Sequence, residues 1–426
     1  MERTLISKIK EGSELIELKG RVLNLRKLGN ISFILLQDYT GQIQIVFEKT
    51  KEIKIGDLIA VKGKVVKDNR AKTGFEIHGE EIEVISSSLE DLSFDISKKD
   101  LKLQLSNLLD FRTTSLRHPK VQAIFKLYDI LLEEYEIVMR EEGFTEVKTP
   151  KIIETASEGG ANFFKIKYFE KEAFLAQSPQ LYKQILTGVF ERVFEIGTIF
   201  RAEPHFTTRH INEFTGLDAE MGMINSFHDV TSMLNKVFIK IFKGIREKGQ
   251  KYLDLYEVEL SSVPEKIPHI KLTEIKKIIK DKYNYSVPAE TDIDPEGERL
   301  ASRYAKEEFD SDFLFITHYP WKEKPFYTMP NKENPEETLG FDLIFKGVEV
   351  ATGSQRIHKY EELIENMKKK GVNPKGLEFY LETFKFSMPP HGGWGLGSER
   401  IIQLILNLGS VKEAVLFPRD VKRLRP

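Results

Sequence analysis

Two arginines flank a short loop between two apolar, strand-like runs of the sequence. Arg201 follows residues 193–200, Arg209 comes after the loop, and a second apolar run covers residues 214–221. Two guanidinium groups on one hairpin, facing one cavity, would bind a polyphosphate at two points, because each presents several N–H donors to anionic oxygens. The same residues would equally suit a surface hairpin whose charges are solvated.

Two carboxylates stand seven residues apart in a strand–turn–strand context. They belong to Asp342 and Glu349. If they converge on a phosphate site, they could hold Mg²⁺, a hard ion that takes few protein oxygens and shares those of the substrate. Alone, the pair is as compatible with a solvated hairpin edge, so its meaning depends on the other segments.

A glycine-rich segment precedes a predicted helix. Residues 393–397 read Gly-Trp-Gly-Leu-Gly, the helix is expected over residues 398–408, and Gly409 would end it, with Arg400 in the first turn. The glycines could let a ligand approach the backbone, but by themselves they favour a tight turn. The segment lacks the context of a dinucleotide fingerprint, and no GxxxxGK[ST] phosphate loop occurs.

Length and composition exclude several classes of protein. The chain has 426 residues, enough for two or three domains, and 64 basic against 66 acidic residues give a formal net charge of −2. This balance argues against nucleic-acid binding by bulk charge, though not against a local basic surface. The chain has no cysteine, which excludes disulfides, thiolate metal sites and cysteine nucleophiles. His205 and His210, five residues apart, do not indicate zinc without a third nearby ligand.

The chain shows no signal for export or membrane insertion. Its N-terminus leads into charged sequence, and no run approaches the ~18 apolar residues that a membrane span requires. We expect a cytoplasmic protein with no membrane association.

The elements that must position these residues fall into two groups. Short runs rich in Ile, Val, Leu and Phe, separated by turn residues, predict strands at 15–22, 31–36, 42–47, 58–66 and 75–85. Five such strands without a long helix indicate a small closed barrel in residues 1–88. Residues 89–117, which begin with a polar stretch, are expected to be a linker or hinge.

The second group, residues 118–426, mixes helices and strands. Apolar residues recur at three- and four-residue spacing from His118 onward, which predicts a long helix that Gly143 ends. Residues 144–149 are expected to form a strand that Pro150 terminates. No regular βαβ alternation follows, so the fold class is predicted as α+β, with a mainly antiparallel sheet flanked by helices.

Taken together, these segments resemble the three motifs of class II aminoacyl-tRNA synthetases. Residues 143–150, after the long helix, resemble motif 1, which builds a dimer interface in that class; motif 1 as a whole would cover about 120–150. Residues 200–203 and 213–218 resemble motif 2 (about 193–221), and residues 395–400 resemble motif 3 (about 388–408). The class I signatures HIGH and KMSKS are absent.

The N-terminal barrel narrows the resemblance to the subclass of aspartate, asparagine and lysine enzymes, known as IIb. Within it the chain is most similar to aspartyl-tRNA synthetases of the archaeal and eukaryotic type. Residues 158–160 resemble that family's mobile loop, residues 177–183 its amino-acid pocket strand, and residues 353–358 its side-chain carboxylate site. The resemblance runs from about residue 15 to the C-terminus.

The resemblance implies a two-step reaction. The α-carboxylate of L-aspartate attacks the α-phosphorus of ATP, and the 3′ end of tRNA(Asp) then takes the aspartyl group. Such chemistry depends mainly on positioning and charge neutralisation, so no protein nucleophile is needed. By resemblance, Arg201 and Arg400 are catalytic, and ATP is bound by Arg201, Glu203, Arg209, His210, Phe214, Glu349 and Arg400. Adenine would lie between Phe214 and Arg400, and Mg²⁺ would be bound by Asp342, Glu349 and Thr352.

The resemblance also implies an aspartate pocket. The substrate ammonium would be bound by Glu158, Ser178, Gln180 and Asp218, and the side-chain carboxylate by Lys183 and Arg356, with His391 and Thr352 nearby. Two cations facing one carboxylate would also reject asparagine, whose amide would point donors at donors.

The barrel resembles an anticodon-binding OB domain. Phe33 would stack on an unpaired base while Arg26 and Gln44 bond base edges, unless Phe33 belongs to the barrel core. Some relatives also charge tRNA(Asn); Lys72 fits the strict pattern and Leu23 fits neither, so the sequence leaves this open. The protein is expected to be a homodimer.

Three alternatives remain. An asparaginyl-tRNA synthetase is disfavoured by Lys183 and Asp218. A synthetase-like asparagine synthetase normally lacks the barrel. A non-catalytic tRNA-binding paralogue would be expected to lose motif arginines or metal-binding acids, and none is missing here.

Overall fold

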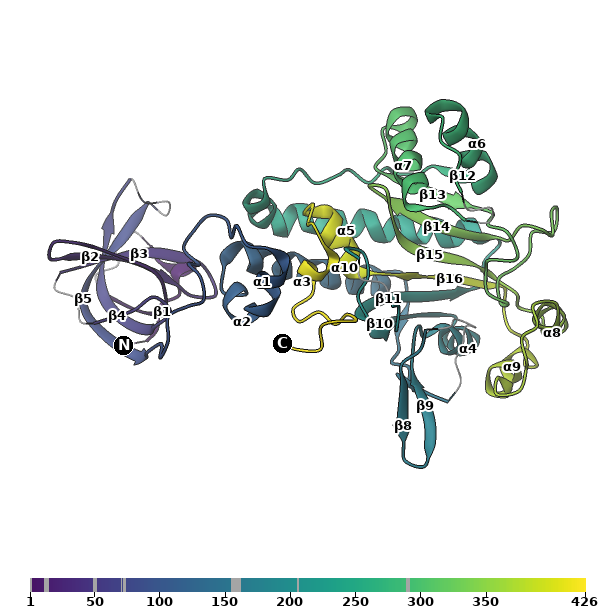
Figure 1. The fold of residues 1–426 in the computed structure, drawn as a ribbon, viewed down its shortest axis with the longest axis horizontal. Helices are drawn as coiled ribbons and strands as arrows, with labels where there is room; N and C mark the ends of the chain where they lie inside the picture. Colours follow the sequence, from purple (N-terminus) through teal and green to yellow (C-terminus); the bar gives the residue numbers. More distant parts are fainter. Residues whose placement is uncertain are drawn as a thin grey trace. The chain divides into compact units, whose positions relative to one another are not determined.

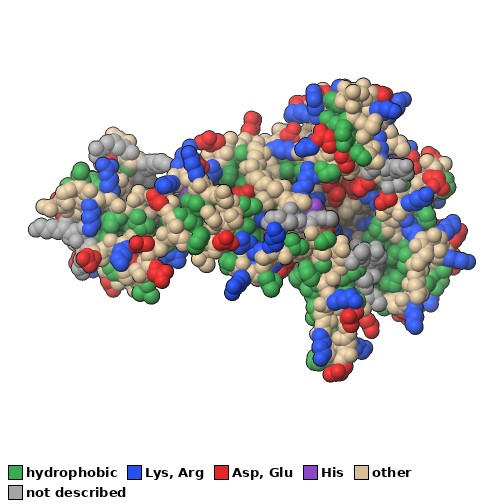
Figure 2. All heavy atoms as spheres, viewed as in Figure 1, with side chains coloured by type: hydrophobic (Ala, Val, Ile, Leu, Met, Phe, Trp, Pro, Cys, Tyr) green, Lys and Arg blue, Asp and Glu red, His purple; other side chains and the backbone are tan. Residues whose placement is uncertain are grey.

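The computed structural model describes residues 2–10, 15–48, 52–69, 71, 74–154, 162–204, 207–288 and 292–426. The chain divides into two compact units, Met1–Gln122 and Ala123–Pro426. Figure 1 shows one unit built mainly of strands and a second unit in which helices surround a large sheet. The visible face in Figure 2 carries basic and acidic side chains intermingled, in keeping with the balanced total charge.

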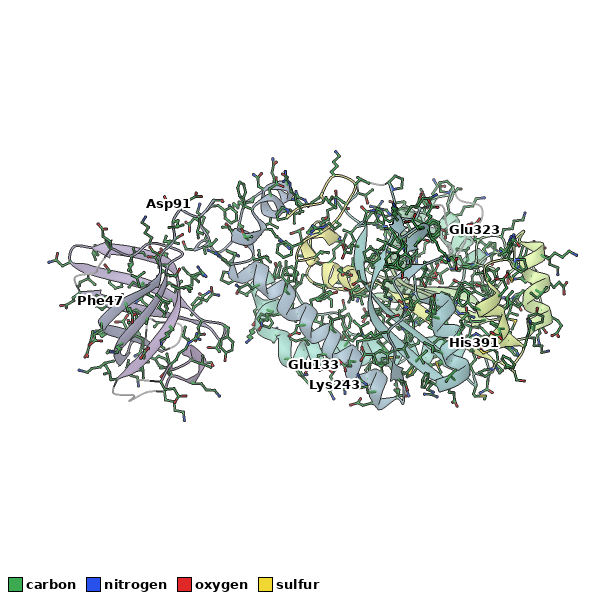
Figure 3. All side chains as sticks on the ribbon, turned by 90° about the horizontal axis from the view of Figure 1, so that it is seen from below. Phe47, Asp91, Glu133, Lys243, Glu323 and His391 are labelled. Carbon is green, nitrogen blue, oxygen red and sulfur yellow. The ribbon has the colours of Figure 1, made fainter. Side chains whose placement is uncertain are left out.

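The first unit contains a closed five-stranded barrel, as predicted. Its strands run in the order β1-β2-β3-β5-β4 and are antiparallel except for the β3–β5 pair. Alternate side chains point inward, so Ile34 and Leu36 reach the core while Phe33 and Leu35, which alternate with them, face outward. Phe47, labelled in Figure 3, also contributes to this core. The strands are β1 (Ile16–Leu28), β2 (Ile31–Gln37), β3 (Gln42–Glu48), β4 (Leu58–Lys67) and β5 (Phe75–Ser86).

Short helices flank the barrel in the sequence. The 3-10 helix η1 (Ile6–Lys8) precedes it, and residues 89–117, expected as a linker, include α1 (Leu105–Asp110) and α2 (Arg112–Ser115). Each of these helices has only one or two turns, too short for helical periodicity to be recognised in the sequence. The helix α3 (Pro119–Glu141) continues into the second unit and ends before Gly143, whose φ of 79° suits glycine.

The second unit is built on an eight-stranded sheet in the order β12-β13-β14-β15-β16-β11-β10-β6. Only the β12–β13 and β10–β6 pairs are parallel, so the α+β prediction with a mainly antiparallel sheet is confirmed. The strands are β6 (Thr145–Glu146), β10 (Arg192–Phe200), β11 (Glu213–Gly222), β12 (His269–Lys271), β13 (Phe313–Thr317), β14 (Gly340–Phe345), β15 (Val348–Arg356) and β16 (His391–Leu396).

Helices cover one face of this sheet and flank its ends. α3 and α5 (Phe227–Tyr256) bury their apolar faces with the sheet in the largest core. α6 (Leu272–Tyr283) and α7 (Pro295–Phe309) pack together on β13 and β14 (Figure 1). A further core joins α4 (Gln180–Phe190), α8 (Tyr360–Lys369) and α9 (Glu378–Phe384). The remaining elements are a small sheet of β7 (Ile152–Ile153), β8 (Lys165–Tyr168) and β9 (Lys171–Leu175), together with α10 (Ser398–Ile405) and η2 (Val411–Ala414).

Three predictions of secondary structure were wrong in detail. The strand expected over 144–149 is only β6, because the backbone N–H of Thr149 bonds the side-chain carboxylate of Glu195 on β10 (3.0 Å) instead of the backbone of that strand. The helix expected over 398–408 ends at Ile405, because Asn407 takes a left-handed conformation (φ 51°) that ends a helix as glycine would. The expected pocket strand 177–183 instead enters α4 at Gln180.

No helix in the described ranges combines the length and apolar character needed to cross a bilayer.

Candidate active site

A cavity of about 220 Å³ lies on the sheet face opposite α3 and α5. Successive side chains of β11 point to opposite faces of the sheet. Leu217, Ala219 and Met221 enter the core, while Asp218 and Glu220 point to the face that carries the cavity. The expected residues that line it are Ser178, Gln180, Arg201, Glu203, Arg209, His210, Phe214, Asp218, Glu349, Thr352, Arg356 and Arg400. The cavity thus brings together segments of the chain that lie over two hundred residues apart.

The other expected residues lie elsewhere. Asp342, Lys183 and His391 are buried and bonded to residues of the wall or to their neighbours. Glu158 falls outside the described residues. Arg26, Phe33 and Gln44 belong to the barrel unit.

The glycine-rich segment is a strand, so the tight turn that we favoured was wrong. Trp394 and Leu396 of β16 enter the core, and Gly393 and Gly395, which alternate with them, face the acids of β11. A Cβ atom on Gly393 would lie 2.3 Å from Oε2 of Glu220, and one on Gly395 would lie 3.3 Å from Oδ1 of Asp218. At Gly393 a Cβ atom would also lie 2.1 Å from the Ala219 carbonyl oxygen, so this position requires glycine, whereas Asp218 only crowds position 395.

The β10–β11 hairpin presents Arg201 to the cavity. Beyond the last strand pair, Arg201 N–H donates to the carbonyl of Asn212 (2.9 Å), and Asn212 Nδ2 donates back to the Arg201 carbonyl (2.6 Å). The Arg201 guanidinium lies 5.5 Å from the centre of the Phe214 ring. Arg400 does not make this contact; its Nη1 donates to the Glu349 carbonyl (2.7 Å).

Arg209 binds a carboxylate that the sequence did not reveal. Its Nη1 lies 2.9 Å from Oε2 of Glu298, which sits in the first turn of α7. Burial and the nearby Glu349 raise the pKa of Glu298 to about 7, although Arg209 opposes the shift. Nearby, Nε2 of His210 lies 3.4 Å from Oε2 of Glu203. The ends of the two basic side chains are thus held by acids at the cavity wall.

The two expected metal-binding acids lie on the β14–β15 hairpin. Asp342 pairs directly with Thr352 across the strands, and a register shift between Leu343 and Ile344 precedes Glu349. Burial raises the pKa of Glu349, and the charge of Asp342 adds to the shift. Two carboxylates and a hydroxyl are hard oxygen donors, the kind that Mg²⁺ takes. Among the residues that the structure describes, no three His, Cys, Asp or Glu side chains gather as a complete metal cage.

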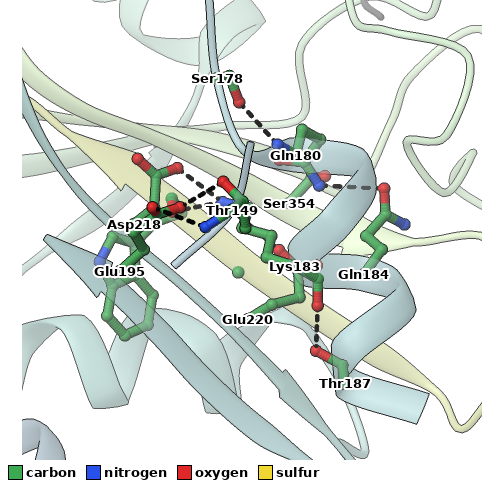
Figure 4. A network of polar contacts seen from close by, with 12 residues as sticks. Thr149, Ser178, Gln180, Lys183, Gln184, Thr187, Glu195, Asp218, Glu220 and Ser354 are labelled. Carbon is green, nitrogen blue, oxygen red and sulfur yellow. Dashed lines mark hydrogen bonds and ion pairs between the residues drawn. The ribbon is translucent and has the colours of Figure 1, made fainter. Parts of the chain in front are cut away.

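A network of buried charges supports the cavity wall at Asp218 (Figure 4). Nζ of Lys183, on α4, lies 3.0 Å from Oδ1 of Asp218, 2.7 Å from the Trp394 carbonyl and 3.6 Å from Oε2 of Glu220. Lys183 is only 2% exposed and Glu220 is fully buried. Burial raises the pKa of Asp218 even though Lys183 opposes it.

Glu220 also holds Arg356, and sequence reasoning missed it. Nε of Arg356 donates to Oε1 of Glu220 (2.9 Å), and its Nη2 donates to Oε1 of Gln180 (3.3 Å). Burial alone would raise the pKa of Glu220, but Arg356 and Lys183 hold it below the usual value. The signal was present in the sequence, because Glu220 stands two residues after Asp218 on one strand and so shares its face.

His391 supports this network from behind. Its ring is fully buried, Nε2 accepts from the side chain of Gln184 (2.9 Å), and Nδ1 donates to the Pro389 carbonyl (2.8 Å). Burial lowers the pKa of His391 to about 4, so the ring is neutral at pH 7. Gln184 in turn accepts from Gln180 (3.1 Å), which links His391 to the residue that contacts Arg356.

In the barrel unit, the expected base-binding residues lie on the outer surface. Arg26 and Phe33 are directly paired on β1 and β2, and Phe33 is half-buried and outside the core, so the barrel-core alternative was wrong. Gln44 Nε2 donates to Oε2 of Glu76 (2.8 Å). Leu23 is buried where the β1–β2 register shifts, and Lys72 lies outside the described residues.

A sheet of this topology carrying arginines and acids around one cavity, together with a five-stranded barrel, is the architecture of a class II synthetase. The chain belongs to the family described as tRNA synthetases class II (D, K and N), whose model matches residues 104–421. A model described as an OB-fold nucleic acid binding domain matches residues 16–85. The resemblance deduced from the sequence motifs is confirmed.

Individual relatives cover nearly the whole chain. The chain is 43% identical over 423 residues to an aspartate–tRNA(Asp) ligase of Pyrococcus horikoshii, covering 96% of both chains. It is 41% identical over 420 residues to an aspartate–tRNA(Asp/Asn) ligase of Aeropyrum pernix, covering 96% of this chain and 94% of the relative. A solved structure of P. horikoshii asparaginyl-tRNA synthetase with asparaginyl-adenylate matches with a TM-score of 0.92 and 30% identity over 100% of both chains.

Proposed function

We propose that the chain is an aspartate–tRNA ligase, which activates L-aspartate with ATP and transfers it to the 3′ end of tRNA(Asp). The observation that carries the proposal is a buried pair of cations: Arg356 lines the cavity, and Lys183 pairs with Asp218 of the cavity wall. The relatives above 40% identity, which are named as aspartate ligases, support the same substrate.

The charges of the pocket match those of aspartate. Lys183 and Arg356 balance Asp218 and Glu220 before any ligand binds, so the pocket does not attract a simple ion strongly. Aspartate brings an ammonium for Asp218 and Gln180 and a side-chain carboxylate for Lys183 and Arg356. Asparagine would direct amide N–H groups at these two donors, and the unpaired buried donors would cost binding free energy.

ATP would occupy the outer part of the cavity. Arg201 would bind the α-phosphate, where negative charge grows during attack, and Arg209, His210 and Arg400 would bind the outer phosphates. Glu203 would accept from the adenine amine while the ring lies against Phe214. To do this, Arg209 must exchange Glu298 for a phosphate oxygen. Glu298 therefore orients the guanidinium before ATP binds.

Magnesium would be bound by Asp342, Glu349 and Thr352. When bound there, the ion would neutralise phosphate charge and help to hold ATP in one geometry. The protein's own part is to orient the α-carboxylate of aspartate toward the α-phosphorus, and Lys183, Arg356 and Asp218 would fix the substrate at three points.

The fold alone does not separate aspartate from asparagine as the substrate, since an asparaginyl-tRNA synthetase matches closely. Lys183 does separate them, because a buried ammonium in that position favours a carboxylate over an amide. The barrel argues against a stand-alone asparagine synthetase. A non-catalytic paralogue is disfavoured because the arginines and acids described above still line the cavity or adjoin it.

The remaining parts of the proposal concern the tRNA and assembly. Arg26, Phe33 and Gln44 would bind anticodon bases on the outer face of the barrel, and two copies would associate through the motif 1 segment that contains α3 and β6. We place the enzyme in the cytoplasm. The tRNA range is tested by charging transcripts of tRNA(Asp) and tRNA(Asn) with labelled aspartate. Charging of tRNA(Asp) is expected, and charging of neither would contradict the proposed function.

A further inference from the structure

Lys324 lies in the connection between β13 and β14, beside the residue labelled Glu323 in Figure 3. Its side chain is only 14% exposed. The aliphatic stem crosses Gly340, where a Cβ atom would lie 3.3 Å from Cε of the lysine. The ammonium lies 4.0 Å from the centre of the Tyr319 ring, close enough for a cation–π contact. These contacts fix the side chain of Lys324 in one position, unlike that of a solvated surface lysine.

The ammonium of Lys324 contacts two residues of the proposed metal site. Nζ lies 2.8 Å from Oδ1 of Asp342 and 3.4 Å from Oγ1 of Thr352. Asp342 is itself buried, so this ion pair is poorly screened by solvent. A divalent ion bound to the same carboxylate would stand at about 2.1 Å from its oxygen and face a positive charge at close range.

The connection that carries Lys324 is anchored three residues before the lysine, at Trp321. Trp321 N–H donates to the Glu336 carbonyl (2.7 Å), and its indole Nε1 donates to Oδ1 of Asn366 on α8 (2.8 Å). Lys324 also lines the cavity, together with Thr352 and Arg400. Its ammonium can therefore leave Asp342 for an anionic substrate in that cavity without a rearrangement of the backbone.

We propose that Lys324 is an internal counter-cation that competes with the divalent metal for Asp342. In the absence of ATP it neutralises the carboxylate and keeps the metal affinity low. When the phosphates of ATP enter the cavity, they supply anionic partners for both cations, so metal and nucleotide bind cooperatively. Lys324 is thus a positioning residue that couples metal binding to substrate binding. This inference rests on the proposed assignment of Asp342, Glu349 and Thr352 to the metal.

The test measures Mn²⁺ binding to the full chain by electron paramagnetic resonance, without aspartate, ATP or tRNA. Lys324→Met removes the charge but keeps a long apolar stem for Gly340. We expect its Mn²⁺ affinity to exceed that of the unaltered protein by roughly tenfold or more, since one nearby positive charge is lost. Lys322→Met, at an exposed position two residues away, is the matched control and should bind Mn²⁺ as the unaltered protein does. Equal affinities in all three proteins would overturn the inference.

Thermal unfolding provides a second readout. Lys324→Met leaves Asp342 without its ammonium, so we expect a lower midpoint in EDTA and a larger rise on adding Mg²⁺ than the unaltered protein shows. A variant that folds only with Mg²⁺ would show the same effect in a stronger form. If it does not fold at all, Lys324→Gln, which keeps a donor for Asp342, is measured instead, and an unchanged response to Mg²⁺ would overturn the inference.

These results are distinguishable from a failure of the proposed function. Neither readout requires aspartate or tRNA, so a protein that does not activate aspartate could still show metal competition by Lys324. Conversely, normal aspartate activation with an unchanged Mn²⁺ affinity in Lys324→Met would refute only the role of this lysine.

Discussion

Replacing Lys183 by Met tests the amino-acid pocket and its energetics together. The lysine is nearly fully buried and bonds Asp218 and the Trp394 carbonyl, with Glu220 at 3.6 Å. Methionine matches the length of its aliphatic stem but offers no charge and no donor. The change therefore leaves a buried carboxylate without its partner, and breaking a buried ion pair in this way costs about 3–5 kcal/mol of folding free energy.

The same substitution should weaken aspartate specifically. A hydrogen bond to a charged group contributes about 1.5–3 kcal/mol, so the KM for aspartate should rise roughly ten- to hundredfold. The KM for ATP should change little, because Lys183 lies among the residues proposed for the amino acid. The two effects are separated by urea denaturation and by aspartate-dependent exchange of pyrophosphate into ATP.

A matched control distinguishes lost stability from lost recognition. Lys412 is buried to a similar degree and pairs with Asp420 at 2.6 Å, apart from the aspartate pocket. Lys412→Met should lose comparable stability while keeping the KM for aspartate. The double variant Lys183→Met/Asp218→Asn should regain part of the stability, because no carboxylate is left unpaired there, but not the aspartate affinity. A normal aspartate KM in Lys183→Met would refute the pocket assignment.

Three other predictions concern the remaining parts of the molecule. Phe33→Ala should leave adenylate formation intact while charging of tRNA falls, and equal losses in both assays would contradict a role in base stacking. The folded pKa of Glu298, about 7, exceeds its usual value of 4.5, so this carboxyl should lower the stability by roughly 3 kcal/mol as pH rises between these values. In urea titrations at pH 4.5 and 7.5, Glu298→Gln should lose about that much less stability than the unaltered protein, and an equal pH dependence in both would count against the assignment. Asn212→Ala removes hydrogen bonds to the carbonyls of Arg201 (2.6 Å) and Glu203 (3.3 Å), so the KM for ATP should rise roughly tenfold with little effect on aspartate, whereas an unaltered ATP KM would show that the loop is held otherwise.

Much of the fold was predictable because local patterns and tertiary structure agree. Each barrel strand shows compact apolar runs between turn residues, and α3 shows a long stripe of apolar residues ended by Gly143. Short elements were the failures. β6 is only two residues long, because Thr149 bonds the side chain of Glu195 on β10 in place of the backbone of that strand. Local patterns contain no information about such a partner.

Site residues that belong to a sequence motif could be predicted from the sequence. Residues that only contact a motif residue in the folded chain could not. Arg201 and Arg400 stand in segments that attract attention by themselves, and both line the cavity. Glu298 lies in an ordinary amphipathic helix and becomes significant only because α7 packs beside the β14–β15 hairpin. Lys324 lies in an irregular connection, where no periodicity indicates which way a side chain points.

The glycine-rich segment shows how an isolated pattern can mislead. Gly-Trp-Gly-Leu-Gly suggests a turn when it is read alone, since strands rarely contain so many glycines. In the fold Gly393 and Gly395 face the acids of β11, and the alternating Trp394 and Leu396 fill the core. Because neighbouring atoms leave no room for its side chains on one face, β16 is as rich in glycine as a loop.

The most direct test of the central claim is ATP–pyrophosphate exchange by the purified full chain with Mg²⁺, comparing aspartate, asparagine and lysine without tRNA. The buried cations Lys183 and Arg356 predict exchange with aspartate and at most trace exchange with the other two. Exchange with asparagine equal to that with aspartate would contradict the pocket assignment, and no exchange with any of the three would contradict the proposal that this chain activates an amino acid.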